Sequence, residues 1–176
     1  MRFTKTPPRT IMEVFKMLPD GTLAELIDGS IYMSPAPTPK HQRIIGKLFR
    51  VLTDFVEKKK LGEIFFSPCD VFLDETANAV QPDIIFISSD NSSLVGEDAI
   101  HGVPDMLFEV LSPGNSQHDL VRKKELYQKF QVKEYWIINP ETNQTTGFFL
   151  KDGKYVEIGR FTGKIKSALL KQEFGF

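Results

Sequence analysis

The sequence predicts an α/β protein with a mixed central β-sheet flanked by helices. Strand-like segments outnumber helical ones, and two long helical patterns, at about 39–60 and 117–131, lie between strand segments. The dipeptide Asp28-Gly29 between two apolar runs also marks a tight hairpin. Strands interleaved with long helices favour a sheet that carries helices on its faces. The 176 residues, 41% of them hydrophobic, predict one domain over residues 1–176.

Composition excludes several classes of protein. The 22 Lys and Arg against 23 Asp and Glu give a net charge of −1, so there is no global basic excess to hold a nucleic acid. The single cysteine, Cys69, excludes an internal disulfide and a Cys-x-x-Cys zinc site, and is typical of a reducing cytoplasm. No apolar run reaches the ~20 residues of a membrane span, and we expect a cytoplasmic protein without membrane contact.

The first third of the chain predicts a short helix, a hairpin and a long helix. Thr10 and Glu13 have the spacing of a capping box before an apolar helical pattern. Strands are expected at Leu23–Ile27 and Ser30–Met33. A proline-rich connector then leads into the long helix at about 39–60, with Thr38 as its N-cap and a single apolar stripe along one side.

The remaining segments alternate between strands and a second helix. Strands are predicted at Ile64–Ser67, Asp70–Leu73, Val80–Ile87, Asp105–Leu111 and Tyr135–Ile138, with a loop over 88–103. The second helix, at about 117–131, has Ser116 as its expected N-cap. A hairpin is predicted from Gly147–Leu150 and Tyr155–Ile158, while the tail, Ile165–Phe176, fits no single element.

Three charged residues stand where these patterns call for apolar ones. Asp83 opens the buried-looking strand Val80–Ile87, and Glu109 lies among five apolar residues in the next strand. Lys123 falls near the middle of the apolar stripe of the 117–131 helix. Burying an unpaired charge is costly, whereas a functional site can require one.

Each of these residues also has an ordinary structural explanation. Asp83 follows a proline and fits a turn at a strand start, and Glu109 fits a structural ion pair or an exposed strand edge. Lys123 fits a side chain that extends past the apolar stripe to water, or one that meets a carboxylate such as Asp119, although Asp119 is better placed as a helix cap.

Taken together, the three residues predict a metal-dependent site. Two carboxylates on successive strands repel each other unless a cation lies between them. Carboxylate oxygens with open positions suit Mg²⁺ or Mn²⁺, which favour phosphate as a further ligand. A nearby lysine stabilises charge on phosphate oxygens or helps to orient and deprotonate water. Asp83, Glu109 and Lys123 therefore predict metal-assisted hydrolysis of phosphodiesters, with Asp83 and Glu109 as metal ligands.

Two further residues are candidates for the same site. Glu25 lies in the first strand of the Asp28-Gly29 hairpin, where it is either part of the site or a solvent-facing glutamate. His41 lies in the first turn of the long helix, on the side of its apolar stripe. Because a helix N-terminus favours anions, His41 is a candidate to bind a substrate phosphate; the alternative is a partly buried structural histidine.

The same residues carry a resemblance to a known family. The segments Glu25-Leu26-Ile27-Asp28-Gly29, Gln81-Pro82-Asp83, Phe108-Glu109-Val110-Leu111-Ser112-Pro113, Asp119…Lys123…Tyr127 and Glu134-Tyr135-Trp136 follow one another as in the Uma2 family of restriction-endonuclease-like proteins. That family is grouped with the PD-(D/E)xK nuclease superfamily. The resemblance implies a restriction-endonuclease-like fold, with a mixed sheet and a carboxylate pair on adjacent strands.

The resemblance also implies roles for individual residues. Pro82-Asp83 takes the PD position and Glu109 the acidic position, and Glu25 is an additional acid. Leu111 stands where the superfamily pattern has lysine, so Lys123 is the displaced lysine. Gln131 departs from the glycine usual in the family at the end of the helix, which affects helix termination and not chemistry.

Three hypotheses follow. The first is a Mg²⁺-dependent endonuclease acting on DNA, for which a homodimer would suit the cutting of both strands. The second is a catalytically silent domain that binds nucleic acid or protein, with Lys58–Lys60, Arg122–Lys124 and Lys164–Lys166 as candidate basic segments. The third is a buried ion cluster that only stabilises the fold, in which case replacing Lys123 by methionine would be neutral or stabilising.

Overall fold

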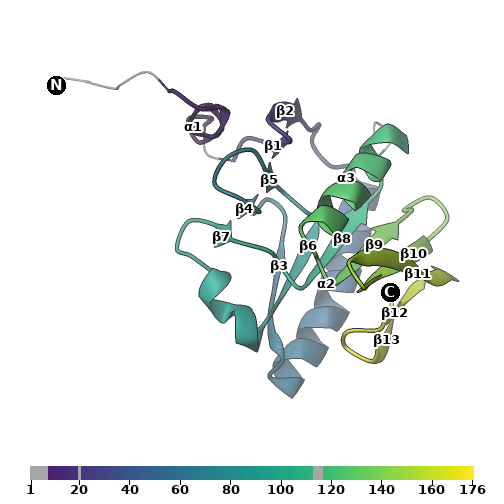
Figure 1. The fold of residues 1–176 in the computed structure, drawn as a ribbon. Coiled ribbons are helices and arrows are strands. Elements are labelled where there is room, and N and C mark those ends of the chain that lie inside the picture. The colour runs from purple at the N-terminus through teal and green to yellow at the C-terminus, as the bar shows by residue number, and fades with distance from the viewer. Residues whose placement is uncertain (1–7, 20, 113–116) are drawn as a thin grey trace.

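The computed structural model describes residues 8–19, 21–112 and 117–176, with the side chains of 117–119 excepted. Its helices are α1 (Ile11–Phe15), α2 (Pro39–Lys59) and α3 (Gln117–Lys129), with a 3₁₀ helix, η1 (Ser89–Leu94) (Figure 1). Its strands are β1 (Ala24–Ile27), β2 (Ser30–Met33), β3 (Gly62–Phe66), β4 (Val71–Phe72), β5 (Ala79–Val80), β6 (Ile84–Ser88), β7 (Ile100–His101), β8 (Met106–Val110), β9 (Glu134–Ile138), β10 (Gln144–Lys151), β11 (Lys154–Thr162), β12 (Lys164–Ser167) and β13 (Gln172–Gly175).

The strands form three sheets. The largest has the order β11-β10-β9-β8-β6-β3, and it is mixed because β8 and β9 are parallel whereas its other neighbours are antiparallel. A second sheet has the order β2-β1-β5-β4-β7, and β12 and β13 form a separate ribbon. The predicted fold class, a mixed sheet flanked by helices, is therefore confirmed.

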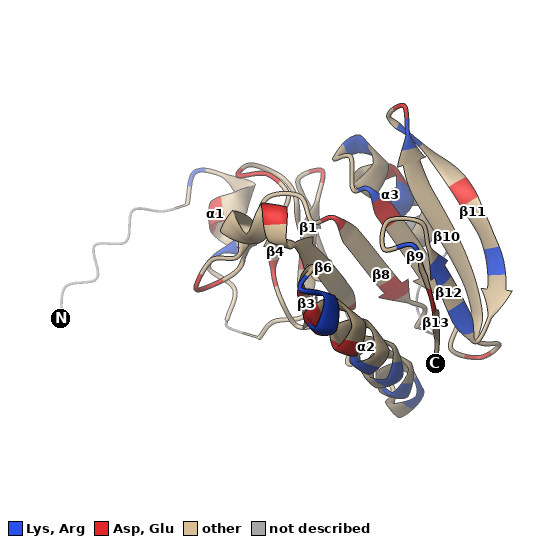
Figure 2. Cartoon of the chain, turned by 90° about the horizontal axis from the view of Figure 1, so that it is seen from below, with Lys and Arg blue, Asp and Glu red and all other residues tan. Residues whose placement is uncertain are grey.

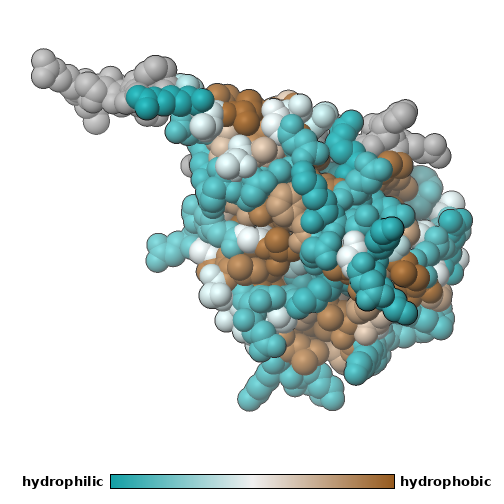
Figure 3. Space-filling model, in the orientation of Figure 1, coloured by the Kyte–Doolittle hydropathy of each residue, from teal (hydrophilic) through white to brown (hydrophobic). Residues whose placement is uncertain are grey.

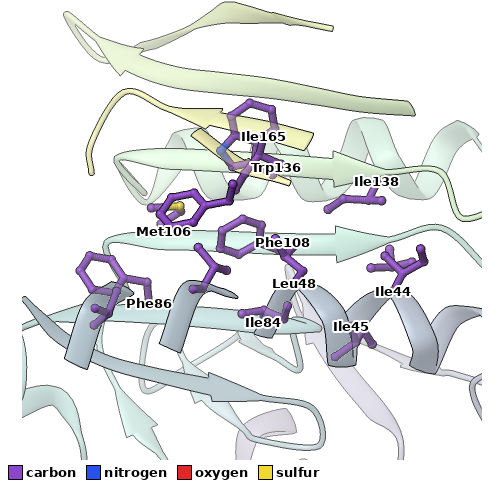
Figure 4. Packing of buried hydrophobic residues seen from close by; sticks show 14 residues of the cluster. Ile44, Ile45, Leu48, Ile84, Phe86, Met106, Phe108, Trp136, Ile138 and Ile165 are labelled. Atoms are coloured by element: carbon purple, nitrogen blue, oxygen red, sulfur yellow. The ribbon is translucent and has the colours of Figure 1, made fainter. Parts of the chain in front are cut away.

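Alternation along β8 distributes the core between the two faces of the large sheet. Met106, Phe108 and Val110 pack on one side with the apolar stripe of α2 (Figure 4). Leu107 packs on the other side in a cluster that contains Leu126 and Tyr127 of α3. Because successive side chains of a strand point to opposite faces, Glu109 is directed to the α3 side together with Leu107. Every residue of β8 is buried, as its apolar sequence predicts.

The predicted caps at Thr10 and Thr38 and the predicted tight turn are present. The Thr10 hydroxyl accepts a hydrogen bond from the backbone N–H of Glu13, and the Glu13 carboxylate accepts one from the Thr10 N–H. Thr38 caps α2 by accepting from the His41 N–H, and Pro39 opens the helix. Asp28 and Gly29 both have positive φ, the backbone of the tight turn that joins β1 to β2.

Two sequence-based predictions of elements need correction, and one segment without a predicted element receives one. The expected strand Val80–Ile87 is two strands in different sheets, because β5 pairs with β1 and β4 whereas β6 pairs with β3 and β8. Gln81, Pro82 and Asp83 connect them, and Pro82 has no N–H to donate to a sheet. The expected loop over 88–103 contains η1 and β7, and the undecided tail forms β12 and β13.

The backbone conformation of Gln131 is one that favours glycine, the residue that the family resemblance leads us to expect at this position. Its φ is 64°, in the left-handed region that glycine adopts without cost. The N–H of Val132 donates back to the carbonyl of Tyr127, which closes the end of α3. The Gln131 side chain donates to the carbonyl of Gln128 and so supports the turn. The departure affects helix termination, as expected.

Two expectations fall outside the part of the chain that the structure describes, namely the N-cap at Ser116 and the role of the Asp119 side chain. On the face shown in Figure 3, apolar side chains are exposed in several places between hydrophilic ones.

None of the helices in the described part of the chain is long and apolar enough to cross a membrane.

Candidate active site

One pocket is lined by all five residues that the sequence singles out. Glu25 comes from β1, His41 from α2, Asp83 from the β5–β6 connection, Glu109 from β8 and Lys123 from α3. The pocket has a volume of about 90 Å³, enough for several water molecules or a hydrated ion. The connector residues Ser34, Pro35 and Pro37 form part of its wall. We call this pocket the acidic cleft.

Lys123 joins the two glutamates. Its Nζ lies 2.9 Å from Glu25 Oε2 and 3.0 Å from Glu109 Oε1, and all three side chains are buried. Burial disfavours the ammonium, but the carboxylates of Glu109 and Glu25 outweigh this effect and raise the pKa of Lys123 above its usual value. Lys123 is therefore a fixed positive charge and not a proton acceptor at neutral pH.

Glu109 is held by a second donor from α3. The Tyr127 hydroxyl donates to Glu109 Oε1 at 2.7 Å, on the same oxygen that Lys123 contacts. Burial, together with the charges of Glu25 and Asp83, outweighs the ammonium and raises the pKa of Glu109 to about 8. Burial and the neighbouring Glu109 raise the pKa of Tyr127 well above its usual value, so Tyr127 remains a donor.

Asp83 is held in the acidic cleft by the backbone of β8 and by His41. Its Oδ2 accepts a 2.7 Å hydrogen bond from the backbone N–H of Val110, the residue after Glu109. His41 Nε2 lies 3.2 Å from the same oxygen and 2.9 Å from the Val110 carbonyl oxygen. Burial lowers the pKa of His41, but the hydrogen bond and charge of Asp83 outweigh it, so the pKa is raised overall.

Gln81 ties the site to the smaller sheet. Its backbone N–H donates to Glu25 Oε1 at 2.9 Å, and its side chain donates to Asp70 Oδ1 and the Thr22 carbonyl. Glu25 thus accepts a hydrogen bond from the Gln81 N–H on Oε1 and pairs with Lys123 through Oε2. The chain crossing between the two sheets, which the sequence pattern did not predict, is what brings Asp83 and Glu25 to one place.

The charges of the cleft fit a divalent cation. Three carboxylates, from Glu25, Asp83 and Glu109, line the cleft with Lys123 and His41, and the pKa of Glu109 is raised first by burial and further by the charges of Glu25 and Asp83. Within the described residues, no group of three His, Cys, Asp or Glu side chains is arranged to hold a metal ion. The protein ligands would be the pair Asp83 and Glu109, with water or substrate oxygen completing the coordination, as Mg²⁺ prefers.

Two contributors to the site escaped the sequence analysis. Tyr127 and Gln81 stand in the segments that resemble the Uma2 family, but the sequence assigns neither of them to the site. The signal for Tyr127 is its place one turn after Lys123 on the same stripe, where a buried hydroxyl needs a polar partner.

Replacing Tyr127 by phenylalanine is expected to destabilise the protein by about 1–3 kcal/mol, because Glu109 loses a buried hydrogen bond. Tyr155→Phe is the matched control, since the Tyr155 hydroxyl is buried without a hydrogen-bond partner among the described residues. Urea unfolding monitored by circular dichroism measures both. Equal effects of the two changes would contradict the importance of the Tyr127–Glu109 contact.

Comparisons with known proteins agree with this fold and family. A profile of the family Uma2, described as "Putative restriction endonuclease", matches residues 12–172. A solved structure titled as a "putative nuclease belonging to DUF820" from Anabaena variabilis superposes with a TM-score of 0.70 and 21% sequence identity. The match covers 85% of this chain and 84% of that one, and shows a shared fold. A search of curated proteins found no match. Because the family profile spans nearly the whole sequence, the chain belongs to the Uma2 family.

Proposed function

We propose that this protein is a Mg²⁺- or Mn²⁺-dependent endonuclease that hydrolyses phosphodiester bonds in DNA. The observation that carries the proposal is the acidic cleft, where Asp83, Glu109 and Lys123 meet from three separate elements. A fold that only needed stability would be served as well by apolar side chains at these buried positions. Membership of a family described as restriction endonucleases supports the same assignment.

The residues of the cleft divide the chemical work. Asp83 and Glu109 would hold the cation. A divalent ion in such a site supplies positive charge to phosphate oxygens and lowers the pKa of water. Lys123, which stays protonated, is placed to stabilise the negative charge that develops on the phosphate as water attacks phosphorus and the bond to the leaving oxygen breaks.

The remaining residues orient these groups. Tyr127 and Lys123 both bind Oε1 of Glu109 and so fix the carboxylate within the cleft. The Val110 N–H fixes Asp83 in the same way. His41 and the N-terminus of α2 border the cleft and favour an approaching phosphate through positive charge.

The proposal is tested by incubating supercoiled plasmid with the purified protein and 5 mM Mg²⁺ or Mn²⁺, with EDTA as the metal-free control. The expected result is nicked and linear DNA in the presence of either metal and intact plasmid in EDTA. Cleavage that persists in EDTA, or intact plasmid under every metal condition while the protein binds DNA, would contradict the proposal and favour a catalytically silent binding domain.

A further inference from the structure

The solvent face of α2 carries a row of positively charged side chains. Lys40, Arg43, Lys47 and Arg50 are all exposed and follow one another at intervals of three or four residues, so they lie along one side of the helix. Figure 2 shows this row as successive blue bands on α2. We call these four residues the basic face of α2.

The opposite side of α2 explains why this row is held in place. His41, Ile44, Ile45 and Leu48 are buried against the large sheet, which fixes the rotation of the helix. The charged side chains therefore point away from the core. Lys40 pairs with Glu141, whereas no acidic side chain of α2 falls between Lys40 and Arg50. A row of positive charge this regular is unexpected in a chain with a net charge of −1.

The basic face begins in the turn of α2 that borders the acidic cleft, although none of its four residues lines the cleft. His41 and Gln42, in the first turn of α2, line the cleft, and Arg43 follows directly. A strand of nucleic acid that places a phosphate in the cleft would thus continue along α2. Ten residues of helix extend about 15 Å, which matches roughly four phosphates of one strand at 3.4 Å of rise each.

We propose that the basic face of α2 binds the phosphate backbone of duplex DNA and guides it to the acidic cleft. This inference rests on the proposed function and adds the surface by which the substrate is held. Contacts of this kind neutralise phosphates and carry no sequence information, so the binding would be independent of sequence and weakened by salt.

A pair of charge-reversal variants tests the inference. Arg43→Glu combined with Lys47→Glu changes the basic face, and Lys151→Glu combined with Lys154→Glu is the control with the same change in net charge. The control residues are exposed and flank the turn between β10 and β11, which contributes no residue to the cleft. All four positions are at the surface, and glutamate is compatible with the helix, so both variants should fold.

Binding of a fluorescent 20-base-pair duplex is measured by anisotropy in EDTA, at salt concentrations from 50 to 200 mM. The α2 variant is expected to bind about tenfold or more weakly than the wild type, with a salt slope smaller by about two, and the control is expected to stay within about twofold. The inference would be overturned if both variants lost DNA affinity equally or if neither lost it. It would also be overturned if poly-glutamate competed for the protein as strongly as unlabelled duplex does.

The plasmid cleavage assay separates this inference from the proposed function. Wild-type cleavage that the α2 reversal and the control reversal reduce equally would leave the nuclease proposal standing and remove the role of the basic face. If only the α2 variant loses DNA binding and the wild type cleaves no DNA with any metal, the result would support DNA binding by the basic face and contradict the proposed nuclease activity.

Discussion

Replacing Glu109 by glutamine is expected to reduce metal-dependent DNA cleavage by about a hundredfold to a thousandfold while leaving the protein folded. The substitution removes one of the two carboxylates that would hold the cation, and losses of this size are typical when an electrostatic contributor to a transition state is removed. Glutamine keeps an oxygen to accept from Tyr127, and Glu25 still pairs with Lys123. Initial rates of plasmid nicking measure the effect.

Glu134→Gln is the matched control for this prediction. Glu134 is also a fully buried glutamate, but it accepts from Trp136 Nε1 and the Leu169 N–H and does not line the acidic cleft. Glutamine keeps one oxygen that can accept from Trp136 or from the Leu169 N–H, and circular dichroism checks that the control is folded. Cleavage by Glu109→Gln at a rate close to that of the control would show that Glu109 is not part of the catalytic machinery.

The variant Glu109→Gln is also expected to change how Mn²⁺ affinity depends on pH. In the wild type, the raised pKa of Glu109 means that a proton competes with the cation, so Mn²⁺ should bind more tightly as the pH rises from 6 to 8 and level off above that. Isothermal titration in buffers of different ionisation enthalpy measures both affinity and proton release. In Glu109→Gln this pH dependence should shrink; an unchanged slope would place the competing proton on another group.

Replacing Lys123 by methionine is expected to lower the free energy of unfolding by about 3–5 kcal/mol, because Glu25 and Glu109 are then left buried without their cation. A neutral or stabilising effect, as expected above for a purely structural cluster, follows when all the charges of the cluster are removed together. Lys123 contacts two carboxylates, so removing it alone unbalances both. Urea denaturation at pH 7 gives the free energy.

The control for Lys123→Met removes the whole cluster. In the triple variant Lys123→Met, Glu25→Gln, Glu109→Gln, no buried charge is left unpaired among these three positions, and most of the lost stability should return. A single variant as stable as the wild type, or a triple variant less stable than the single one, would show that the charges do not depend on one another.

Much of the fold follows from local patterns in the sequence. The capping residues Thr10 and Thr38, the turn at Asp28-Gly29 and the apolar stripe of α2 each set an element through contacts within a few residues. The division of Val80–Ile87 between two sheets depends on which distant strands lie on either side. Local hydrophobicity indicates that such a segment is buried, but not which sheet it joins.

The candidate site also has residues that the sequence pattern reveals and residues that it does not. The charges of Asp83, Glu109 and Lys123 conflict with their apolar surroundings in the sequence, which is why they were selected, and the structure places them around one pocket. Tyr127 does not conflict with the apolar pattern of its helix, because its ring is apolar. The sequence therefore gives no direct sign that its hydroxyl binds Glu109. The basic face of α2 was also missed, since its residues are spread over the helix whereas the runs considered were contiguous.

A crystal of the protein soaked in Mn²⁺ and measured at a wavelength where manganese scatters anomalously tests the central claim most directly. The account predicts an anomalous peak in the acidic cleft, coordinated by carboxylate oxygens of both Asp83 and Glu109, with Lys123 beside it. Manganese bound only elsewhere on the protein, with the contacts of Asp83, Glu109 and Lys123 unchanged, would contradict it.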